Sequence, residues 1–400
     1  MKRITRSAYL NRLIDLKDVP VIKVITGVRR AGKSFLVDDF VSYIKKYEKK
    51  ANIVYIKMQE LDNEELKDYK KLHDFIISKY KKNVKNYLFI DEVQLCEKFE
   101  LTINSIHSKD IYDIYVTGSN AFLLSSDLAT LFTGRYIEIE VFPFSFKEYL
   151  EYFNDYKDID KAFDDYVIKG GFSGTYLTNN NKDRNIYLNN IFETVVERDL
   201  VQKYNLPDST VLKKLSDFLM YSIANIISSN NITNSLIDNK IQTNHTTISN
   251  YIDYLCNAYM FYKVKRYDIK GKEYLSTLEK YYLVDTGLRF SRLGKANLDY
   301  GRTYENIVAL ELMRRGYDIY VGKLYQKEVD FVATKNGKIM YIQVSDNITD
   351  NKTFAREYGP LLQIKDAYPK YIIARTKHDD YTYEGIIIKD IANWLLNENI

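Results

Sequence analysis

The sequence predicts an α/β protein whose N-terminal part is built on a parallel β-sheet, and three observations support this. Short apolar stretches alternate with amphipathic helical stretches between residues 21 and 141, which is the pattern of parallel strands joined by crossover helices. The pattern becomes mainly helical from residue 145, and alternating strands and helices resume after residue 297. Because 46% of the 400 residues are hydrophobic, each of these parts is able to bury its own core.

The apolar spacing places each element of the N-terminal part. A helix is expected at Arg6–Leu16, beside the site described below, and a short apolar strand follows at Val21–Ile25. The residues Phe35–Ile44 have helical spacing. Because ligands bind at the carboxyl ends of parallel strands, the polar residues that follow the strands are the candidate site residues. The other strands are expected at 52–57, 87–91, 114–117 and 136–141, with helices at 72–81, 99–107 and 125–132.

Between the first expected strand and the helix after it, the chain has the spacing Gly-x4-Gly-Lys-Ser of a P-loop, from Gly27 to Ser34. The glycines allow backbone torsions and a close approach that a Cβ would block. The N–H groups of the loop and the helix dipole then face an anion. Lys33 would reach the β- and γ-phosphates, and the Ser34 hydroxyl would bind Mg²⁺. The sequence therefore predicts a P-loop NTPase sheet that binds ATP and Mg²⁺, with the nucleotide held by Gly27, Arg30, Ala31, Gly32, Lys33, Ser34 and Phe35.

Acidic and polar residues follow two further strands. The stretch Leu88–Glu92 is apolar and ends in two acids, so Asp91 would hold Mg²⁺ and Glu92 would activate the attacking water. Ser119 and Asn120 follow the next strand, and either would hold the lytic water and sense the γ-phosphate. The competing interpretations are a surface acidic pair at the first position and an ordinary polar turn at the second.

Arg135 follows Gly134 directly before the fifth expected strand. We expect its guanidinium at the ligand edge of the sheet, where it would contact the nucleotide of a neighbouring subunit in a homo-oligomer. Arginine fingers of this kind contribute roughly 10³–10⁵ in rate. The alternative is an arginine that caps helix carbonyls or pairs with a local acid.

These motifs resemble those of an AAA-type ATPase family of bacteria and archaea, in which a domain of unknown function follows the ATPase. The resemblance covers nearly the whole chain and implies a cytosolic protein driven by nucleotide. It rests on the ATPase stretches Gly27–Ser34, Phe89–Gln94, Thr117–Asn120 and Gly134–Arg135, and on the later stretches Phe142–Tyr149, Gly170–Phe172 and Glu197–Leu200. The ATPase motifs are specific for nucleotide binding, whereas the later stretches identify relatives without implying a reaction. From composition, Gly170–Gly174 is expected to be a flexible break.

The middle of the chain contains a helix–turn–helix pattern within residues 232–262, followed by a candidate wing with several basic residues. Basic wings contact phosphates, so residues 232–275 are a candidate DNA-binding region. The candidate recognition helix has Thr246, Thr247, Ser249 and Asn250 in place of charged residues. The alternative is a module that only packs against its neighbours.

The C-terminal part resembles the restriction-endonuclease-like fold. In that fold a helix Glu, a strand Asp and a following Glu-x-Lys build a metal-dependent hydrolytic site. Glu305 and Asp330 match the first two positions, but Gln343 and Ser345 stand where the second Glu and the Lys would be. We therefore expect this fold to be retained without nuclease activity.

Taken together, we expect an AAA-type ATPase domain at 1–144, a helical lid or connector at 145–204, a winged-helix-like domain at 205–296 and a degenerate nuclease-like domain at 297–400. The expected function is a Mg²⁺-dependent ATP hydrolase whose cycle moves C-terminal domains that bind DNA or a protein partner. The alternatives are an ATP-dependent binding switch with little hydrolysis, and a nuclease. Two distant cysteines, the absence of an apolar leader and the absence of a span-length apolar run predict a cytoplasmic protein without membrane contact.

Overall fold

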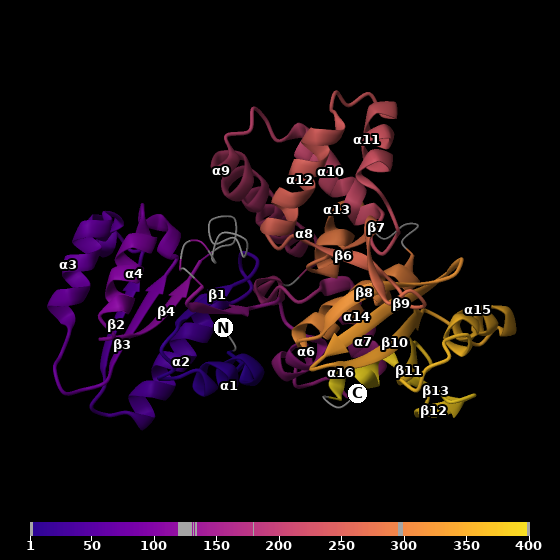
Figure 1. Cartoon of the computed structure of the whole chain (residues 1–400), viewed down its shortest axis with the longest axis horizontal. Helices are drawn as coiled ribbons and strands as arrows, with labels where there is room; N and C mark the ends of the chain where they lie inside the picture. Colours follow the sequence, from indigo (N-terminus) through magenta and orange to yellow (C-terminus); the bar gives the residue numbers. More distant parts are fainter. Residues whose placement is uncertain are drawn as a thin grey trace. The chain divides into compact units, whose positions relative to one another are not determined.

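The computed structural model describes residues 3–118, 130, 132, 134–178, 180–294 and 299–397, without the side chains of 276 and 277. The chain forms two compact units (Figure 1). Unit 1 comprises Met1–Phe142, Glu197–Leu206 and Asn257–Tyr259, and unit 2 comprises the three stretches Pro143–Val196, Pro207–Cys256 and Met260–Ile400.

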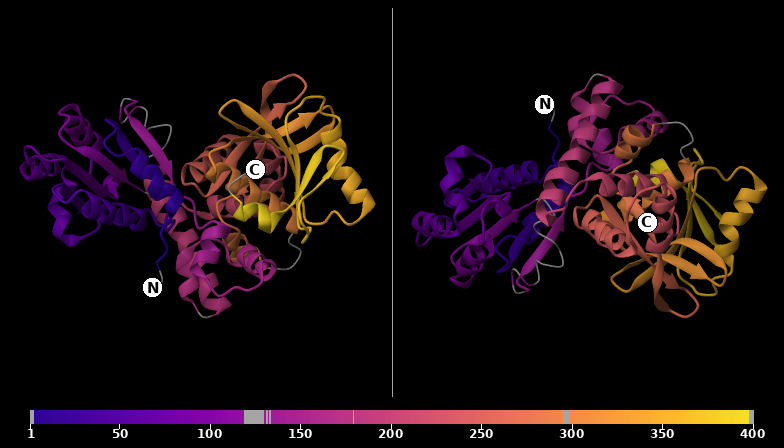
Figure 2. Two further views of the ribbon diagram at one scale, coloured as in Figure 1. Left: turned by 90° about the horizontal axis from the view of Figure 1, so that it is seen from below. Right: turned by 90° about the horizontal axis from the view of Figure 1, so that it is seen from above.

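Five parallel strands form the sheet of unit 1, in the order β2-β3-β4-β1-β5. Helices α3 and α4 pack on one face, where Ile76 and Ile103 are buried against the strands, and α2 packs on the other through Phe40 against Phe89 and Tyr115 (Figures 1 and 2). The predicted parallel α/β fold is therefore confirmed. The elements are α1 Ser7–Asp15, β1 Ile22–Thr26, α2 Lys33–Tyr47, β2 Asn52–Lys57, η1 Leu61–Lys67, α3 Tyr69–Lys79, β3 Asn86–Asp91, η2 Val93–Leu95, α4 Phe99–Ser108, β4 Asp113–Thr117 and β5 Tyr136–Glu140.

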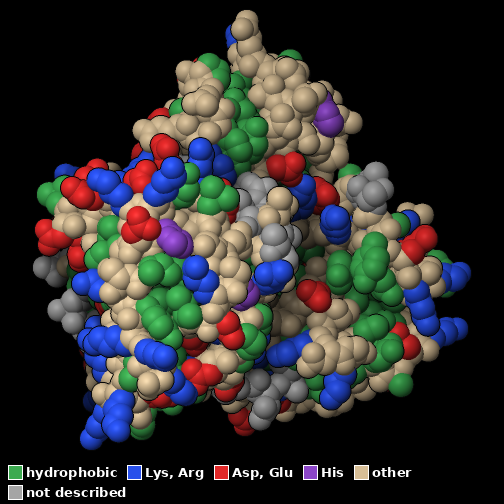
Figure 3. Space-filling view, turned by 60° about the vertical axis from the view of Figure 1, so that its left-hand side comes forward, with side chains coloured by type: hydrophobic (Ala, Val, Ile, Leu, Met, Phe, Trp, Pro, Cys, Tyr) green, Lys and Arg blue, Asp and Glu red, His purple; other side chains and the backbone are tan. Residues whose placement is uncertain are grey.

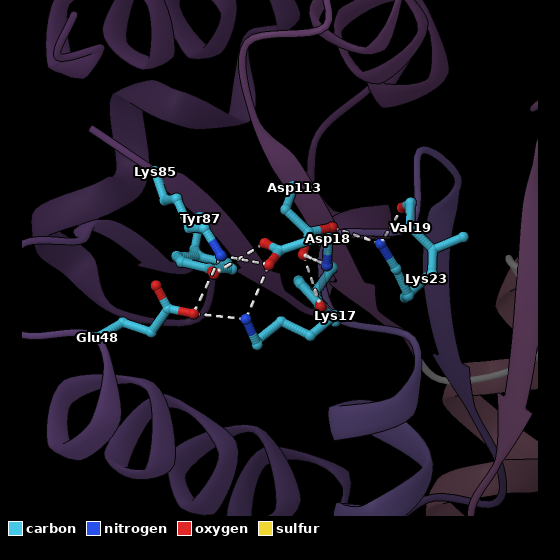
Figure 4. A network of polar contacts seen from close by, with 9 residues as sticks. Lys17, Asp18, Val19, Lys23, Glu48, Lys85, Tyr87 and Asp113 are labelled. Carbon is cyan, nitrogen blue, oxygen red and sulfur yellow. Dashed lines mark hydrogen bonds and ion pairs between the residues drawn. The ribbon is translucent and has the colours of Figure 1, made fainter. Parts of the chain in front are cut away.

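Charged residues gather at the amino ends of these strands (Figure 4). Lys23 of β1 is fully buried, and its ammonium group is paired with the Asp113 carboxylate and donates to the Val19 carbonyl oxygen. Burial lowers the pKa of Lys23, and Asp113 opposes this decrease. In the same network Lys17 bridges Asp18 and Glu48, at 2.8 and 2.5 Å. These contacts balance the charges at the amino ends of the strands, which lie opposite the carboxyl end of β1.

Unit 2 is built on an eight-stranded mixed sheet, in the order β12-β13-β11-β10-β9-β8-β6-β7. Helices α7, α14 and α16 cover one face, and α15 covers the other. The strands are β6 Phe261–Asp268, β7 Glu273–Leu283, β8 Asp318–Leu324, β9 Lys327–Lys335, β10 Lys338–Ser345, β11 Lys370–Ala374, β12 Tyr381–Tyr383 and β13 Ile386–Asp390. The helices are α6 Phe146–Tyr152, α7 Ile159–Lys169, η3 Ser173–Leu177, α8 Asn181–Thr194, α10 Thr210–Tyr221, α11 Ser229–Asp238, α12 His245–Asn257, α13 Thr286–Leu293, α14 Tyr300–Arg314, α15 Asn351–Leu362 and α16 Ile391–Leu396.

The region predicted as a winged helix is joined to the C-terminal sheet. Helices α11 and α12 form the predicted pair, although α11 begins earlier than expected because Ser228 caps it by accepting from the Asn231 N–H at 3.2 Å. The predicted wing is the hairpin β6–β7, and β6 also pairs in parallel with β8. Residues expected in two separate domains thus share one sheet. None of the helices that the structure describes has both the length and the apolar composition needed to cross a membrane.

The Gly170–Gly171–Phe172 stretch is a tightly packed junction, not the flexible break that its composition suggests. Asp285, which is 3% exposed, accepts from the Gly171 N–H at 2.5 Å and from the Leu288 N–H at 3.3 Å. A Cβ at Gly171 would lie 2.3 Å from the Phe144 carbonyl oxygen, and a Cβ at Gly170 would lie 2.2 Å from the Asp285 carboxylate. Glycine is needed here because backbone and carboxylate approach it so closely.

We predict that Gly171→Ala destabilises unit 2 by roughly 2–4 kcal/mol, because the new methyl group collides with main-chain atoms that cannot rotate away. The matched control is Gly359→Ala in α15, where the nearest atom to the added Cβ is the flexible Lys327 Nζ at 3.9 Å. Urea unfolding monitored by tryptophan fluorescence measures both, since the chain's only tryptophan, Trp394, lies in the core of unit 2. Equal midpoints for the two variants would contradict the prediction.

Candidate nucleotide-binding site

The phosphate loop joins the end of β1 to the start of α2, as the sequence predicts. Three of its residues have left-handed backbone torsions, with φ of +128° at Gly27, +67° at Arg30 and +98° at Gly32. A Cβ at Gly27 would lie 2.2 Å from the Val141 carbonyl oxygen, so this position also requires glycine for space. Such alternation of backbone conformation directs successive N–H groups into one concavity that suits an anion.

Lys33 is the buried cation of this loop. It is 4% exposed, and its Nζ donates to the carbonyl oxygens of Gly27 at 2.8 Å and Val28 at 3.2 Å. Burial lowers the pKa of Lys33, while the negative charges of Glu92 and Asp91 oppose this decrease. Charge-assisted hydrogen bonds to anionic oxygens are stronger than those to carbonyl oxygens, so a phosphate placed in the loop would be a better partner.

The residues predicted to bind Mg²⁺, Ser34 at the start of α2 and Asp91 at the end of β3, lie together. Asp91, the last residue of β3, hydrogen-bonds to the side chain of Ser34 and accepts from Thr117 Oγ1 at 2.5 Å. Burial raises the pKa of Asp91, and these two hydrogen bonds oppose the rise. One carboxylate and one hydroxyl fit Mg²⁺, which takes few protein ligands and completes its shell with waters and phosphate oxygens. Bound here, Mg²⁺ would screen the phosphate charge.

Glu92 follows Asp91 in a left-handed conformation, with φ of 57° and ψ of 51°. Its N–H donates to Thr117 Oγ1 at 3.0 Å, so one threonine hydroxyl connects both acids. Gln94 Nε2 donates to Glu92 Oε2 at 2.5 Å and orients that carboxylate. The predicted residues Ser119 and Asn120 lie outside the described residues.

The structure adds residues that the motifs do not contain. Arg6, which is 4% exposed, donates to the carbonyl oxygen of Ala31 in the phosphate loop at 3.0 Å, so α1 lies beside the loop as expected. Arg3 donates to the Phe35 carbonyl oxygen at 3.2 Å and pairs with Asp39 at 2.7 Å. The only sequence signal was the basic start of a short amphipathic helix.

A second addition comes from far along the chain. Asp199 contacts Arg29 inside the phosphate loop, with 3.1 Å between its Oδ1 and the guanidinium. It lies in the π-helix Val195–Val201, within the segment 197–206 that belongs to unit 1. The stretch Glu197–Leu200 was recognisable as a family sequence, but nothing in it indicates a partner 170 residues earlier.

The structure corrects the predicted position of Arg135. Tyr136 pairs with Ile22 in the parallel register of β5 and β1, and the Ile22 N–H donates to the Arg135 carbonyl oxygen at 3.0 Å. Arg135 therefore precedes β5 at the amino edge of the sheet, while the phosphate loop follows β1 at the carboxyl edge. A five-residue strand, roughly 16 Å long, separates these edges, which exceeds the reach of an arginine side chain. The exposed Arg135 is thus far from the loop of its own subunit.

Unit 2 contains a separate cluster of carboxylates around a buried lysine. Lys280 of β7 is 2% exposed, and its Nζ lies 2.7 Å from Glu305, 2.6 Å from Glu328 and 3.5 Å from Asp330. Burial would lower the pKa of Lys280, but these carboxylates outweigh it and raise that pKa. Tyr282 donates to Glu305 Oε1 at 2.7 Å. An ammonium group thus occupies the place among the acids that a metal would need.

The two positions that depart from the nuclease pattern make structural contacts in this cluster. Gln343 Oε1 accepts from the Asp330 N–H at 2.7 Å, and Gln343 Nε2 donates to Glu357 at 2.9 Å. Ser345 Oγ donates to the Asn347 carbonyl oxygen at 3.0 Å. A cavity of about 510 Å³ lies over these residues. Among the residues that the structure describes, no group of three or more His, Cys, Asp or Glu side chains is arranged to hold a metal.

Three family models match consecutive parts of the chain. A model described as an AAA domain matches residues 20–150, and two domains of unknown function, DUF8612 and DUF4143, match 160–299 and 300–394. Together with the loop, the buried Lys33 and the acids at the end of β3, this defines unit 1 as an ATP-binding P-loop domain of the AAA class.

The chain is also similar to single proteins over most of its length. A Walker-type ATPase of Pyrococcus abyssi superposes with a TM-score of 0.44 and 15% identity, covering 72% of this chain and 95% of its own. An uncharacterized protein of Haemophilus influenzae is 38% identical over 98% of both chains, and one of Methanocaldococcus jannaschii is 29% identical over 88% of this chain and 81% of its own. The chain belongs to the AAA-type ATPase family of bacteria and archaea in which a domain of unknown function follows the ATPase.

Proposed function

We propose that the protein is a Mg²⁺-dependent ATP hydrolase whose nucleotide cycle moves its C-terminal parts. The observation that carries this proposal is the convergence of Lys33, Ser34, Asp91 and Glu92 at the carboxyl ends of β1 and β3. In this arrangement Lys33 and the loop N–H groups bind phosphate, and Ser34 and Asp91 hold the metal. Glu92, oriented by Gln94, accepts a proton from the attacking water.

The partner proposed for the moving parts is DNA, contacted through residues 232–275, or a protein. The exposed Lys265, Lys270 and Lys272 of the β6–β7 hairpin support DNA because exposed lysines that are close together suit phosphate contacts. On the face shown in Figure 3, however, Lys and Arg side chains are interspersed with Asp and Glu side chains. On this face the mixture of charges therefore favours DNA contacts by a few lysines over DNA binding along a broad basic surface.

ATP with Mg²⁺ should stabilise unit 1 by roughly 2.7 kcal/mol at about 100 times its Kd, because ligand binds only the folded state. The measurement is the unfolding midpoint of nucleotide-free protein with and without saturating ATP. Lys33→Ala should lose most of this shift, since the loop then lacks its buried cation. Lys45→Ala, an exposed position on the same helix, should keep it. A wild-type midpoint that saturating ATP leaves unchanged would refute ATP binding.

Turnover should depend on Glu92 and on Arg135 of a neighbouring subunit, because Arg135 is exposed and beyond reach of the loop of its own subunit. Glu92→Gln and Arg135→Ala should each retain ATP binding but lose phosphate release by roughly 10³-fold or more. A mixture of the two variants should regain part of the activity, because an intact Glu92 site then meets an intact Arg135. The assay is phosphate release with and without duplex DNA, in oligomers whose mixing is verified.

Full activity of Arg135→Ala alone, or no recovery in mixed oligomers, would remove the trans-acting arginine. If the wild type binds ATP and releases almost no phosphate, the binding-switch alternative is correct.

We further propose that unit 2 is not a nuclease, because Lys280 neutralises the carboxylates that would hold a metal and Ser345 supplies no cation. The purified protein with Mg²⁺ or Mn²⁺ should leave duplex and single-stranded DNA intact, as followed on a denaturing gel. Metal-dependent cutting that disappears in Asp330→Ala would contradict this.

A further inference from the structure

The contact between Asp199 and Arg29 has no role in the hydrolytic scheme above. Asp199 is 4% exposed, and only 18% of the Arg29 side chain is exposed, so water screens the pair weakly. Burial raises the pKa of Asp199, Arg29 opposes this rise, and the negative charge of Glu92 adds to it. Lys33 is also within electrostatic range of the Asp199 carboxylate. Asp199 is therefore a buried anion beside the loop that binds phosphate.

The Asp199 carboxylate compensates the positive charge of the loop only while no phosphate is bound. Arg29 and Lys33 bring two positive charges into a confined space, and the carboxylates of Asp199, Asp91 and Glu92 compensate them. The triphosphate of ATP would bring several negative charges to the same cations. Like charges that share a buried site disfavour each other strongly, so Asp199 and the phosphates compete for the loop.

We propose that Asp199 is a positioning residue that senses nucleotide: it holds Arg29 while the loop is free of phosphate, and ATP displaces it. This inference rests on the ATP-binding function proposed above. The Asp199 carboxylate and the polyphosphate of ATP are both anions that bind the Arg29 guanidinium. The polyphosphate is the stronger ligand because its charge is larger and more of its oxygens accept hydrogen bonds. Displacement breaks the ion pair that joins the segment 197–206 to Arg29 of the loop.

The place of Asp199 in the chain gives this displacement a consequence. The segment Glu197–Leu206 belongs to unit 1, but the residues directly before and after it belong to unit 2. Asp199 also lies in the π-helix Val195–Val201, an irregular helical geometry that is frequent at functional sites. A change at Asp199 therefore acts on a short stretch tied at both ends to unit 2.

A second returning segment provides a matched control. Tyr259, in the segment 257–259 of unit 1, donates to Thr26 Oγ1 at 3.1 Å and also hydrogen-bonds to Glu138. Tyr259→Phe removes these hydrogen bonds next to the loop without changing a carboxylate. This variant therefore distinguishes the loss of a hydrogen bond that anchors a returning segment from the loss of the Asp199 charge that competes with phosphate.

The first test measures the affinity for ATP and ADP with Mg²⁺ by competition against a fluorescent nucleotide. Asp199→Asn keeps the shape of the side chain and removes its charge, so ATP should bind roughly five- to tenfold more tightly, and ADP should gain less. Tyr259→Phe should leave the ratio of ATP to ADP affinity unchanged. A merely structural role for Asp199 predicts weaker binding of both nucleotides together with a lower melting temperature, and that result would overturn the proposal.

The second test follows hydrogen exchange of the backbone amides in 197–206 in the full-length protein. In the wild type, ATP should speed this exchange, and in Asp199→Asn the exchange should already be fast without nucleotide. Arg29→Gln breaks the same contact from the other side and should also speed exchange without nucleotide, which keeps the test decisive if Asp199→Asn misfolds. Exchange in the wild type that ATP slows or leaves unchanged would overturn the sensor.

The controls separate this inference from the proposed function. A wild type that binds no ATP refutes both. A wild type that binds ATP through Lys33, combined with an Asp199→Asn variant of unchanged affinity and exchange, refutes only the sensor.

Discussion

The structure of unit 1 depends on one electrostatic constraint, which is the burial of a lysine at the start of α2. Lys33 is almost completely buried, so its charge must be compensated by groups inside the protein. The carboxylates of Asp91 and Glu92 follow β3, and the Thr117 hydroxyl of β4 donates to the Asp91 carboxylate and accepts from the Glu92 backbone N–H. In the sheet β4 lies between β1 and β3, so Thr117 at its end stands between the strand that leads into the loop and the strand that carries the acids.

The sequence predicts residues of the candidate site where their chemistry is local. The glycines of the loop, Lys33, Ser34 and the acids at the end of β3 are each defined by spacing within a few residues and by one apolar strand. The role of Asp199 is not predictable from the sequence, because a contact between residues 170 apart leaves no periodic pattern. Lys280 was missed for a related reason. A lysine on a strand is normally a solvated residue, and only the fold shows the three carboxylates that surround it.

The structure differs from the sequence prediction for Arg135 and for the hairpin β6–β7, because each was predicted from its own segment alone. Arg135 was expected at the ligand edge, but the parallel pairing of β5 with β1 requires the residue before β5 to lie at the amino edge. The hairpin β6–β7 has the length and turn of a wing, yet β6 offers a row of main-chain donors and acceptors that β8 satisfies. Pairing between distant strands decides both outcomes, and local composition does not contain that information.

The route of the chain links the nucleotide site to the rest of the protein. The chain leaves unit 1 after Phe142 and returns to it twice, and each returning segment makes a part-buried polar contact in or next to the phosphate loop. Tyr259 binds Thr26, the last residue of β1, and Asp199 binds Arg29, three residues further along. Arg29 lies inside the phosphate loop and Thr26 lies directly before it, so the proposed rearrangement around phosphate acts on the Asp199 contact, while the Tyr259 contact anchors the strand. Packed interiors move between discrete arrangements and do not deform continuously. If the nucleotide cycle moves the later segments as proposed, these two contacts are the direct physical route from the phosphate loop to those segments.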